Sequence, residues 1–301
     1  MTQTRASGHS AATMRTPAET MALIARETRS QPGAVPKHLG GHEIPGGNRL
    51  FALGQFVLHT GTGFGFHYRP GIGVSYTVDP GADPAELELW LYGSVYAAIA
   101  CLNGLYPVHA SAIADNGRVH AFTGPSGAGK STLVAGLGRR GYPLFCDDTL
   151  LLDLSDPGRI VALPGHKRLK LTDHALALAG AEVLGPVGSG TGKSYAAPAA
   201  GSLREPLDLA SLTFLEQGAE AVLDPISGAA RFARLDDDHY TQQLYFDAQA
   251  PTRAMMFALR SRLAQHLAMA RLVRPFSGEG FAKSLDLAEA AVRQFSKEPP
   301  Q

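Results

Sequence analysis

Short apolar runs separated by glycine and polar residues dominate the first third of the chain. Residues 1–45 are rich in Ser, Thr, Gly, Pro and Arg, with one helical pattern at residues 17–28, so we expect a mobile N-terminal arm or a small cap. From residue 50 to 78, short alternating runs punctuated by glycine predict strands. Asp83-Pro84 then provides an N-cap and a first-turn proline for a helix that ends near residue 102. Residues 46–104 are therefore predicted to form a small β-rich region plus a helix.

The next part of the chain has the pattern of a hairpin, a loop and a helix. Two apolar runs, at residues 108–114 and 119–123, flank the turn signal Asp115-Asn116-Gly117. A glycine-rich loop follows, then helical periodicity over residues 130–139 and a short apolar strand at 144–146. This alternation of strand and helix predicts an α/β fold.

Beyond residue 148 the pattern is weaker. Residues 209–215 are predicted to form a strand, and residues 252–273 and 281–295 two helices with apolar residues at helical spacing. Residues 105–301 are therefore predicted to be one domain with helices at its C-terminal end.

The glycine-rich loop carries the first candidate chemistry. Its glycines let the backbone turn sharply and direct N–H groups at phosphate oxygens, Lys130 neutralises the phosphates, and the Ser131 hydroxyl is placed to bind Mg²⁺. An apolar strand precedes the loop and a helix follows it, as this motif requires. The predicted nucleotide-binding residues are Gly124, Pro125, Ser126, Gly127, Ala128, Gly129, Lys130, Ser131 and Thr132.

A second glycine-rich segment, residues 188–194, does not fit the same spacing. Val187 stands where the first glycine should be, and no apolar strand leads into it. We interpret it as a flexible loop. Lys193 on such a loop has the reach to close over bound phosphates.

Asp147-Asp148, directly after the strand at 144–146, provides the second candidate chemistry. A carboxylate beside a P-loop can bind Mg²⁺ or accept the proton of an attacking hydroxyl. We predict that one aspartate is the base and that the other binds Mg²⁺ together with Ser131; the order of side chains at a strand end favours Asp148 as the base. His109, on the neighbouring strand, is placed to face the pair and tune its proton affinity. The structural alternatives are an exposed turn for the aspartates and a purely structural role for His109.

Composition and charge limit the partners. Among 301 residues, 27 basic side chains balance 27 acidic ones, so no global field attracts nucleic acid or an anionic membrane. Cys101 and Cys146 lie in apolar runs and are predicted to be buried free thiols, which fits a cytoplasmic protein. Residues 89–114 lack charged side chains, but Asn103, Gly104 and Pro107 interrupt the run, so no membrane span is expected.

These residues together resemble a known family. His109 before a hairpin, the P-loop, the Arg140-Gly141 turn and Asp147-Asp148 are similar in order and spacing to the catalytic core of bacterial HPr kinase/phosphorylase, over about residues 108–153. That family transfers a phosphoryl group from ATP, with Mg²⁺, to a serine of a protein, and its fold is related to phosphoenolpyruvate carboxykinase. The resemblance implies that Lys130 and Ser131 serve phosphate and Mg²⁺, that the aspartates supply base and metal ligand, and that His109 is their neighbour.

The remainder departs from the HPr enzymes. Residues 163–170 stand where that family has a glutamate-bearing glycine motif, so neither phosphorylase activity nor HPr as the substrate is implied. The chain looks more like the HPr-kinase-related proteins found with peptide-modification genes, including kinases of lasso-peptide precursors. Within this segment the basic run His166, Lys167, Arg168 and Lys170 is either a solvated face or an anion-binding site, and Arg204 is a candidate for contacting a peptide.

The resulting hypothesis is an ATP- and Mg²⁺-dependent kinase acting on a serine, or another hydroxyl, of a peptide or small protein. Two alternatives remain open: a small-molecule kinase, and a nucleotide-binding regulatory protein without transfer activity. A closed cavity would favour the first alternative and an open groove the peptide kinase. The sequence leaves open the substrate's identity, the formation of a homo-oligomer, and the roles of Lys193 and Arg204.

Overall fold

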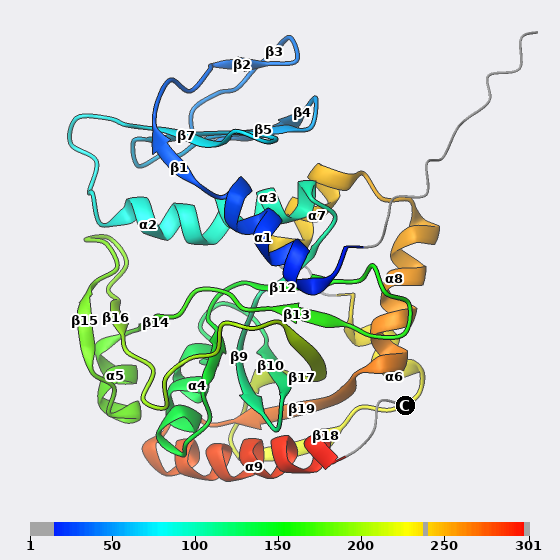
Figure 1. Cartoon of the computed structure of the whole chain (residues 1–301). Coiled ribbons are helices and arrows are strands. Elements are labelled where there is room, and N and C mark those ends of the chain that lie inside the picture. The colour runs from blue at the N-terminus through cyan, green and yellow to red at the C-terminus, as the bar shows by residue number, and fades with distance from the viewer. Residues whose placement is uncertain (1–14, 237–239, 298–301) are drawn as a thin grey trace, which may run out of the picture.

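A large mixed sheet below and a small sheet above organise the molecule (Figure 1). The computed structural model describes residues 15–236 and 240–297. Within that part, the large sheet has nine strands and the small one five, and two further sheets have three and two strands. The protein is therefore mixed α/β, as the sequence predicts.

The small sheet consists of the glycine-punctuated runs predicted as strands. Its order is β1-β7-β6-β5-β4, with β1 parallel to β7 and the other pairs antiparallel. Successive residues of β5 face opposite sides: Phe56 packs toward α3, whereas Val57 packs with Leu39 and Ile44 on the other face. The strands are β1 (Ser30–Pro32), β4 (Arg49–Ala52), β5 (Gln55–His59), β6 (Phe64–Arg69) and β7 (Gly73–Val78), with a separate hairpin of β2 (His38–Leu39) and β3 (His42–Glu43).

The segment expected to be a mobile arm is packed from Pro17 onward. Helix α1 (Pro17–Glu27) begins with a capping box between Thr16 and Glu19, and Pro17 stands in its first turn. Its Thr20 hydroxyl donates to a carboxylate oxygen of the core residue Asp153 at 2.9 Å. Because β1 also joins the small sheet, the β-rich unit starts earlier than residue 46. Residues 1–14 lie outside the described part of the chain.

One helical segment connects the small sheet to the large one. It comprises α2 (Glu86–Trp90), a π-type turn η1 (Leu91–Val95) and α3 (Tyr96–Leu102). The predicted helix after Asp83-Pro84 is therefore present, but Gly93, with φ −102° and ψ −105°, interrupts its regular geometry. This interruption lies against the site described below.

The large sheet places three parallel strands at its centre. Strand β17 is parallel to both β10 and β19, while β9, β11, β12, β13, β18 and β8 add antiparallel pairs. The predicted turn between β9 and β10 is a tight one, since Asn116 and Gly117 have φ values of 47° and 72°. The strands are β8 (Tyr106–Val108), β9 (Ala110–Asp115), β10 (Arg118–Thr123), β11 (Leu144–Cys146), β12 (Leu150–Asp153), β13 (Val161–Leu163), β17 (Leu207–Gln217), β18 (Val222–Pro225) and β19 (Ala268–Arg274).

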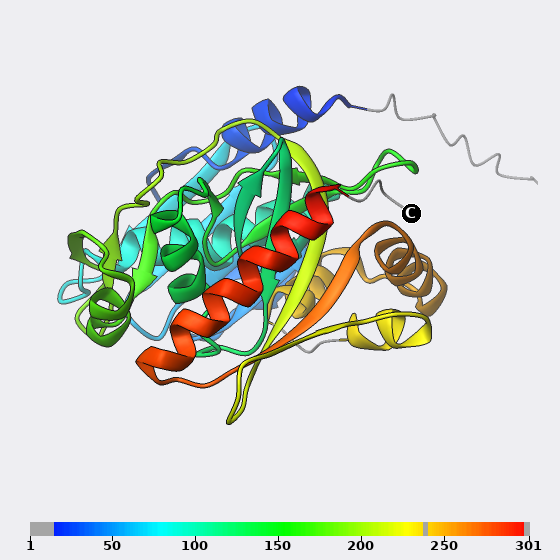
Figure 2. The same cartoon turned by 90° about the horizontal axis from the view of Figure 1, so that it is seen from below.

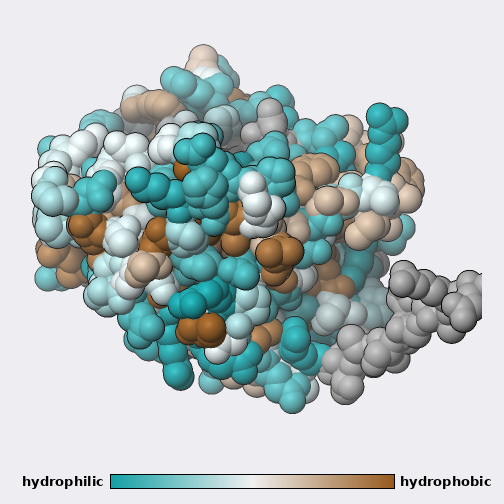
Figure 3. Space-filling model, turned by 90° about the horizontal axis from the view of Figure 1, so that it is seen from above, coloured by the Kyte–Doolittle hydropathy of each residue, from teal (hydrophilic) through white to brown (hydrophobic). Residues whose placement is uncertain are grey.

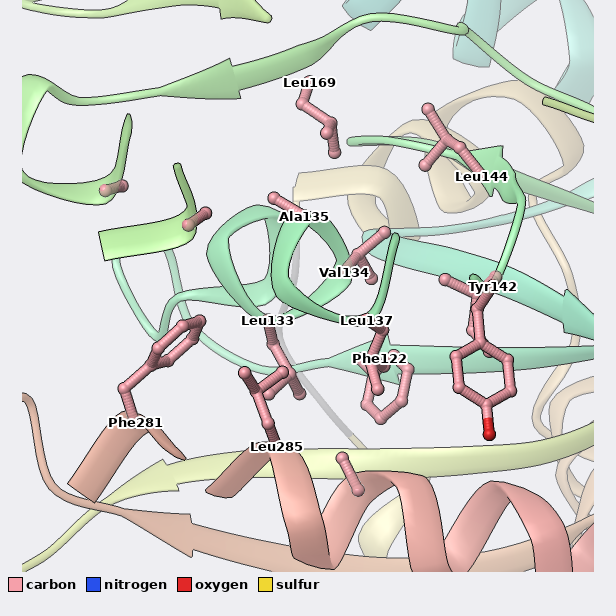
Figure 4. Packing of buried hydrophobic residues seen from close by; sticks show 14 of the residues in the cluster. Phe122, Leu133, Val134, Ala135, Leu137, Tyr142, Leu144, Leu169, Phe281 and Leu285 are labelled. Carbon is pink, nitrogen blue, oxygen red and sulfur yellow. The ribbon is translucent and has the colours of Figure 1, made fainter. Parts of the chain in front are cut away.

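Helices cover both faces of this sheet. On one face, α4 (Lys130–Arg139) and α9 (Gly278–Lys297) lie together, with α5 (Asp173–Ala179) beside α4 (Figures 1 and 2). Leu133 and Leu137 of α4 pack with Phe122 of the sheet and with Phe281 and Leu285 of α9 (Figure 4). The other face carries α6 (Ala229–Arg234), α7 (Tyr240–Gln249) and α8 (Arg253–His266).

The C-terminal prediction is wrong in one element. Residues 252–273 were expected to form one helix, but α8 ends at His266 and residues 268–274 form strand β19. Leu267 has extended geometry at the boundary, and β19 then pairs with β17 along seven residues. Tertiary pairing with the central strand outweighs a helical spacing that a short apolar run also satisfies. The last helix is longer than predicted.

A three-stranded sheet stands beside the large one. It consists of β14 (Leu169–Leu171), β16 (Ser194–Ala196) and β15 (Val183–Pro186), in that spatial order. The glycine-rich segment 188–194 forms the loop of its β15–β16 hairpin and the first residue of β16. The backbone N–H of Ser189 in this loop donates to a carboxylate oxygen of Asp83 at 2.6 Å, which ties the loop to the start of the connecting helix.

Several large apolar side chains of the described residues are exposed, including the adjacent Val183 and Leu184. Leu53 and Ile72, at turns of the small sheet, are among the most exposed. Seen from above, hydrophilic residues cover most of the face and hydrophobic ones appear as separate spots (Figure 3). None of the described helices has the length and apolar character needed to cross a membrane.

Candidate active site

The glycine-rich loop joins β10 to α4, as a P-loop does. Gly124, Gly127 and Gly129 have φ values of 148°, 85° and 84°, which side chains with a Cβ rarely adopt. A Cβ on Gly124 would lie 2.7 Å from the backbone oxygen of Leu215 on β17. The loop therefore passes too close to the central strand β17 for a side chain at Gly124. Its backbone N–H groups lie at the N-terminal end of α4, where the helix dipole is positive.

Lys130 is buried inside this loop. Its ammonium group donates to the backbone oxygens of Gly124 and Pro125 at 2.8 and 3.1 Å, and the side chain is 6% exposed. The sequence predicts a phosphate-neutralising lysine here, and the structure places its charge at the loop.

Asp147 is bound by donors from three directions. One carboxylate oxygen accepts from the hydroxyls of Ser131 and Ser111, at 2.7 and 2.6 Å, and the other accepts from the N–H of Lys170 at 2.9 Å. Asp147 is 1% exposed. The side chain is thus held against the predicted Mg²⁺ ligand Ser131.

Asp148 has a different environment. Its φ of 75° turns it away from Asp147, and its carboxylate accepts from the Lys170 ammonium at 2.6 Å. His109 lies beside it, with Nδ1 2.9 Å from the Asp148 backbone oxygen and 3.6 Å from a carboxylate oxygen. Burial raises the pKa of Asp148, but the charges of Lys170, His109 and Lys130 outweigh it, so the pKa lies below its ordinary value. Asp148 is therefore held ionised.

Three adjacent strands bring these residues together. Strand β11, which ends just before the aspartates, pairs with β9, and β9 pairs with β10, which leads into the P-loop. His109 immediately precedes β9, and its backbone oxygen accepts from the Thr123 hydroxyl at 3.0 Å. His109, the P-loop and the two aspartates therefore lie close together, as the sequence predicts.

A cavity of about 410 Å³ opens at Asp148. Ser131, Asp148 and Lys170 form its inner wall. The connecting helix contributes a second wall, at residues 89, 90, 93 and 94, and the β15–β16 loop a third, which includes Lys193. A Cβ added to Gly93 would lie 3.7 Å from a carboxylate oxygen of Asp148, so the helix passes close to this group. A second cavity, of about 760 Å³, lies outside the P-loop between Ser126 and Phe276.

The side chains near the P-loop include few candidate Mg²⁺ ligands. Among residues 15–236 and 240–297, no group of three or more His, Cys, Asp or Glu side chains could hold a metal by itself. Mg²⁺ bound to nucleotide phosphates needs only one or two protein oxygen ligands. Ser131 and Asp147, whose oxygens already meet, fit that requirement.

This protein has a distant structural similarity to a solved kinase structure. Neither the family models nor the curated proteins include a match to this sequence. Among solved structures, the HPr(Ser) kinase/phosphatase from Coxiella burnetii is similar, with a TM-score of 0.32 and 9% identity, over 62% of this chain and 97% of that chain. This is a distant similarity at the level of the fold, and it carries no argument about the site.

Sequence reasoning missed three residues of the site. Lys170 was only one member of a basic run, yet it bonds to both aspartates; its signal was a lone polar residue inside the apolar strand β14. Ser111 is one of several small residues on β9. Arg274 lies just beyond the predicted helix 252–273; it ends β19, is 3% exposed, and donates to the Gly129 backbone oxygen at 2.9 Å. Burial lowers the pKa of Arg274 to about 10.

The basic run does not form one solvated face. Arg168 makes an ion pair with Glu88 and stacks on Tyr195, and the His166 ring contacts Tyr92 and Tyr195. Lys170 bonds to Asp148 in the site, whereas Lys167 donates to the backbone oxygen of Phe145. The four residues of the basic run therefore have different environments.

Proposed function

We propose that the protein is an ATP- and Mg²⁺-dependent kinase that transfers the γ-phosphoryl group to a serine, or another hydroxyl, of a peptide or small protein. The observation that carries the proposal is that two carboxylates with different hydrogen-bond partners lie beside the P-loop. Asp147 is bonded to Ser131, and Asp148 lies at a cavity beside the same serine. Metal binding and orientation of the attacking hydroxyl are both recurring parts of phosphoryl-transfer sites.

The P-loop side of the site would hold the nucleotide. Its N–H groups and the Lys130 ammonium stabilise negative charge on the phosphates, and the cavity outside the loop has room for the nucleoside. Ser131 and Asp147 would hold Mg²⁺, which when bound supplies charge stabilisation at the transferring group. Arg274 supports the loop at Gly129 and keeps its geometry.

The Asp148 side would hold the acceptor. Asp148 takes the proton of the attacking hydroxyl while the new oxygen–phosphorus bond forms and the bond to the departing ADP breaks. Lys170 and His109 position its carboxylate and keep it in the ionised form that a base requires. Lys193, at the edge of the cavity, is placed to neutralise charge there.

A small-molecule kinase is the second candidate. The cavity at Asp148, at about 410 Å³, falls within the range of sites that hold small ligands. The shape of the cavity supports the peptide hypothesis. Three separate parts of the chain form the walls of the cavity, and it is open between them. Assaying a serine peptide against small hydroxyl compounds separates the two candidates.

The aspartates test the mechanism. Asp148→Asn keeps shape and hydrogen bonding but cannot accept a proton, so ATP binding should persist while turnover falls about 10²-fold or more. Asp147→Asn should instead raise the Mg²⁺ concentration needed for half-maximal activity, because a neutral amide oxygen is a weaker ligand for a hard cation. The measurements are ATP and Mg²⁺ titrations of each variant. If both variants stay fully active, the pair is only a turn and this mechanism fails.

A further inference from the structure

A groove of about 590 Å³ lies on the other side of the connecting helix from the catalytic cavity. One wall is helix α1, with Met21, Ile24 and Ala25. The connecting segment contributes Tyr92 and Tyr96, and residues 163–168 with Arg204 complete the groove. We call it the α1 groove.

Two cations of the α1 groove lack an acidic partner. Lys167 donates to the backbone oxygen of Phe145 and lies 5.3 Å from the centre of that residue's ring. Within residues 15–236 and 240–297, neither Lys167 nor Arg204 makes an ion pair with a carboxylate. Burial, together with the positive charge of Arg204, lowers the pKa of Lys167 to about 8. Two cations that repel each other and stay unpaired would be stabilised by a bound anion.

The neighbouring basic residues make a useful contrast. Arg168 is paired with Glu88 and Lys170 with Asp148, so the fold satisfies these two charges internally. Arg168 lines the α1 groove too, so among the described cations of this groove Lys167 and Arg204 are the two left for an external partner.

The opposite wall of the groove is apolar. Ile24 is buried at its base, and Tyr92 is 47% exposed, with its ring 4.8 Å from that of His166. A wall of apolar and aromatic groups facing two cations suits a ligand that carries carboxylates and apolar side chains together. An acidic peptide segment has this chemistry, whereas a free inorganic anion would leave the apolar wall unused.

The α1 groove is linked to the catalytic residues through the protein itself. The backbone N–H of Asp147 donates to the His166 oxygen at 3.3 Å, and the turn Leu91–Val95 separates the two spaces. Tyr92 of this turn lines the groove, while Gly93 lines the cavity at Asp148. A peptide held in the groove would therefore lie one helical wall away from the proposed base.

From this geometry we propose that the α1 groove docks an acidic segment of the acceptor peptide, with Lys167 and Arg204 binding its carboxylates. The inference rests on the proposed kinase function and adds the substrate class: a peptide whose reactive hydroxyl is accompanied by acidic and apolar residues.

Binding without ATP tests the proposal independently of phosphoryl transfer. The probes are a fluorescein-labelled peptide of tandem Glu-Glu-Leu-Ser repeats and its Gln-Gln-Leu-Ser counterpart, followed by fluorescence anisotropy. Wild-type protein should bind the glutamate peptide about tenfold or more tightly, and added salt should reduce the difference. Arg204→Glu should remove this preference, and Lys167→Met should weaken it. Arg253→Glu is the matched control, since Arg253 is exposed on α8 and outside the groove lining, and should leave binding unchanged.

A charge exchange makes the test specific. Arg204→Glu should gain affinity for a Lys-Lys-Leu-Ser peptide that the wild type binds poorly. In the kinase assay the same variant should raise KM for the glutamate peptide with kcat unchanged. No preference of the wild type for the glutamate peptide, or full retention of that preference in Arg204→Glu, overturns the docking site. Phosphorylation that is equally good for both peptides and insensitive to Arg204→Glu would refute the groove while leaving the kinase in place. Preferential binding of the glutamate peptide without any phosphorylation would refute the kinase instead.

Discussion

At the scale of single residues, His120 shows a polar network that serves the fold rather than the site. Its two ring nitrogens lie 2.8 Å from the Ser211 hydroxyl oxygen and 3.0 Å from that of Ser296. Ser296 gives its own hydrogen to a carboxylate oxygen of Asp115 at 2.6 Å. Ser296 must therefore accept from His120 Nε2, which leaves Nδ1 to accept from Ser211. The network ties α9 to the central strands with a neutral imidazole.

This network predicts a loss of stability in mild acid. Burial lowers the pKa of His120 to about 4, below its ordinary value of 6.5. Above the ordinary pKa neither state binds a proton here, so the contribution to stability is complete. As pH falls from there toward the folded-state pKa, the unfolded chain takes up a proton that the folded one does not. Between about pH 7 and pH 5 the free energy of unfolding should fall by about 2 kcal/mol on this account.

The measurement is urea unfolding at a series of pH values for the wild type and for His120→Gln. The variant is expected to be less stable at neutral pH, and its stability should change less over the same interval. Parallel curves for the two proteins would show that His120 does not titrate as described.

At the scale of elements, the contact between α4 and α9 keeps the P-loop helix in place. A Cβ added to Gly136 of α4 would lie 2.7 Å from a methyl carbon of Leu285 and 2.8 Å from the Phe281 ring, both on α9. A Cβ added to Gly138, in the same helix, would meet its nearest neighbour, the Ala199 backbone nitrogen, at 3.8 Å. The two glycines therefore differ in packing but share a helix.

From this difference we predict that alanine has opposite effects on stability at Gly136 and at Gly138. Gly136→Ala should lower the free energy of unfolding by about 1–3 kcal/mol, because the helices must separate or Leu285 must leave its position. Gly138→Ala should be neutral or stabilise by up to about 1 kcal/mol, since alanine favours a helix. Denaturant unfolding of both variants checks this, and equal stabilities would mean that the close contact is absent.

Local signals predicted most of the elements around the P-loop. The hairpin, the loop, α4 and the aspartates lie within one continuous stretch, so their spacing along the chain determines their neighbourhood. Residues joined by distant pairing were not predicted. Lys170 approaches the aspartates because the chain just before β14 meets the chain just after β11, where the Asp147 N–H donates to the His166 oxygen. Arg274 reaches Gly129 because β19 pairs with β17. For the segment from Pro17 the sequence predicts a mobile arm or a small cap, whereas its buried Ile24 packs with residues far along the chain, such as Leu105 and Leu151.

At the scale of the whole molecule, the proposed active site lies where three parts of the chain meet. The central sheet supplies the P-loop and the aspartates, the connecting helix supplies one wall, and the β15–β16 loop supplies another. The Ser189–Asp83 hydrogen bond and the Arg168–Glu88 ion pair join the loop and the core to the connecting helix. These contacts hold the connecting helix against the space in front of Asp148.

The central claim, ATP-dependent phosphoryl transfer at this loop, is tested most directly by intact-mass measurement of candidate acceptors. Serine-containing peptides, including those encoded beside this gene, are incubated with ATP, Mg²⁺ and the wild type, Lys130→Ala or the surface control Lys283→Ala. The wild type and the control should add the mass of one phosphoryl group to an acceptor. Lys130→Ala should be slower by about 10³-fold or more, because the charge that stabilises the transferring group is lost, while its circular dichroism stays unchanged. Near-normal transfer by Lys130→Ala, or no mass gain with the wild type, would contradict the account.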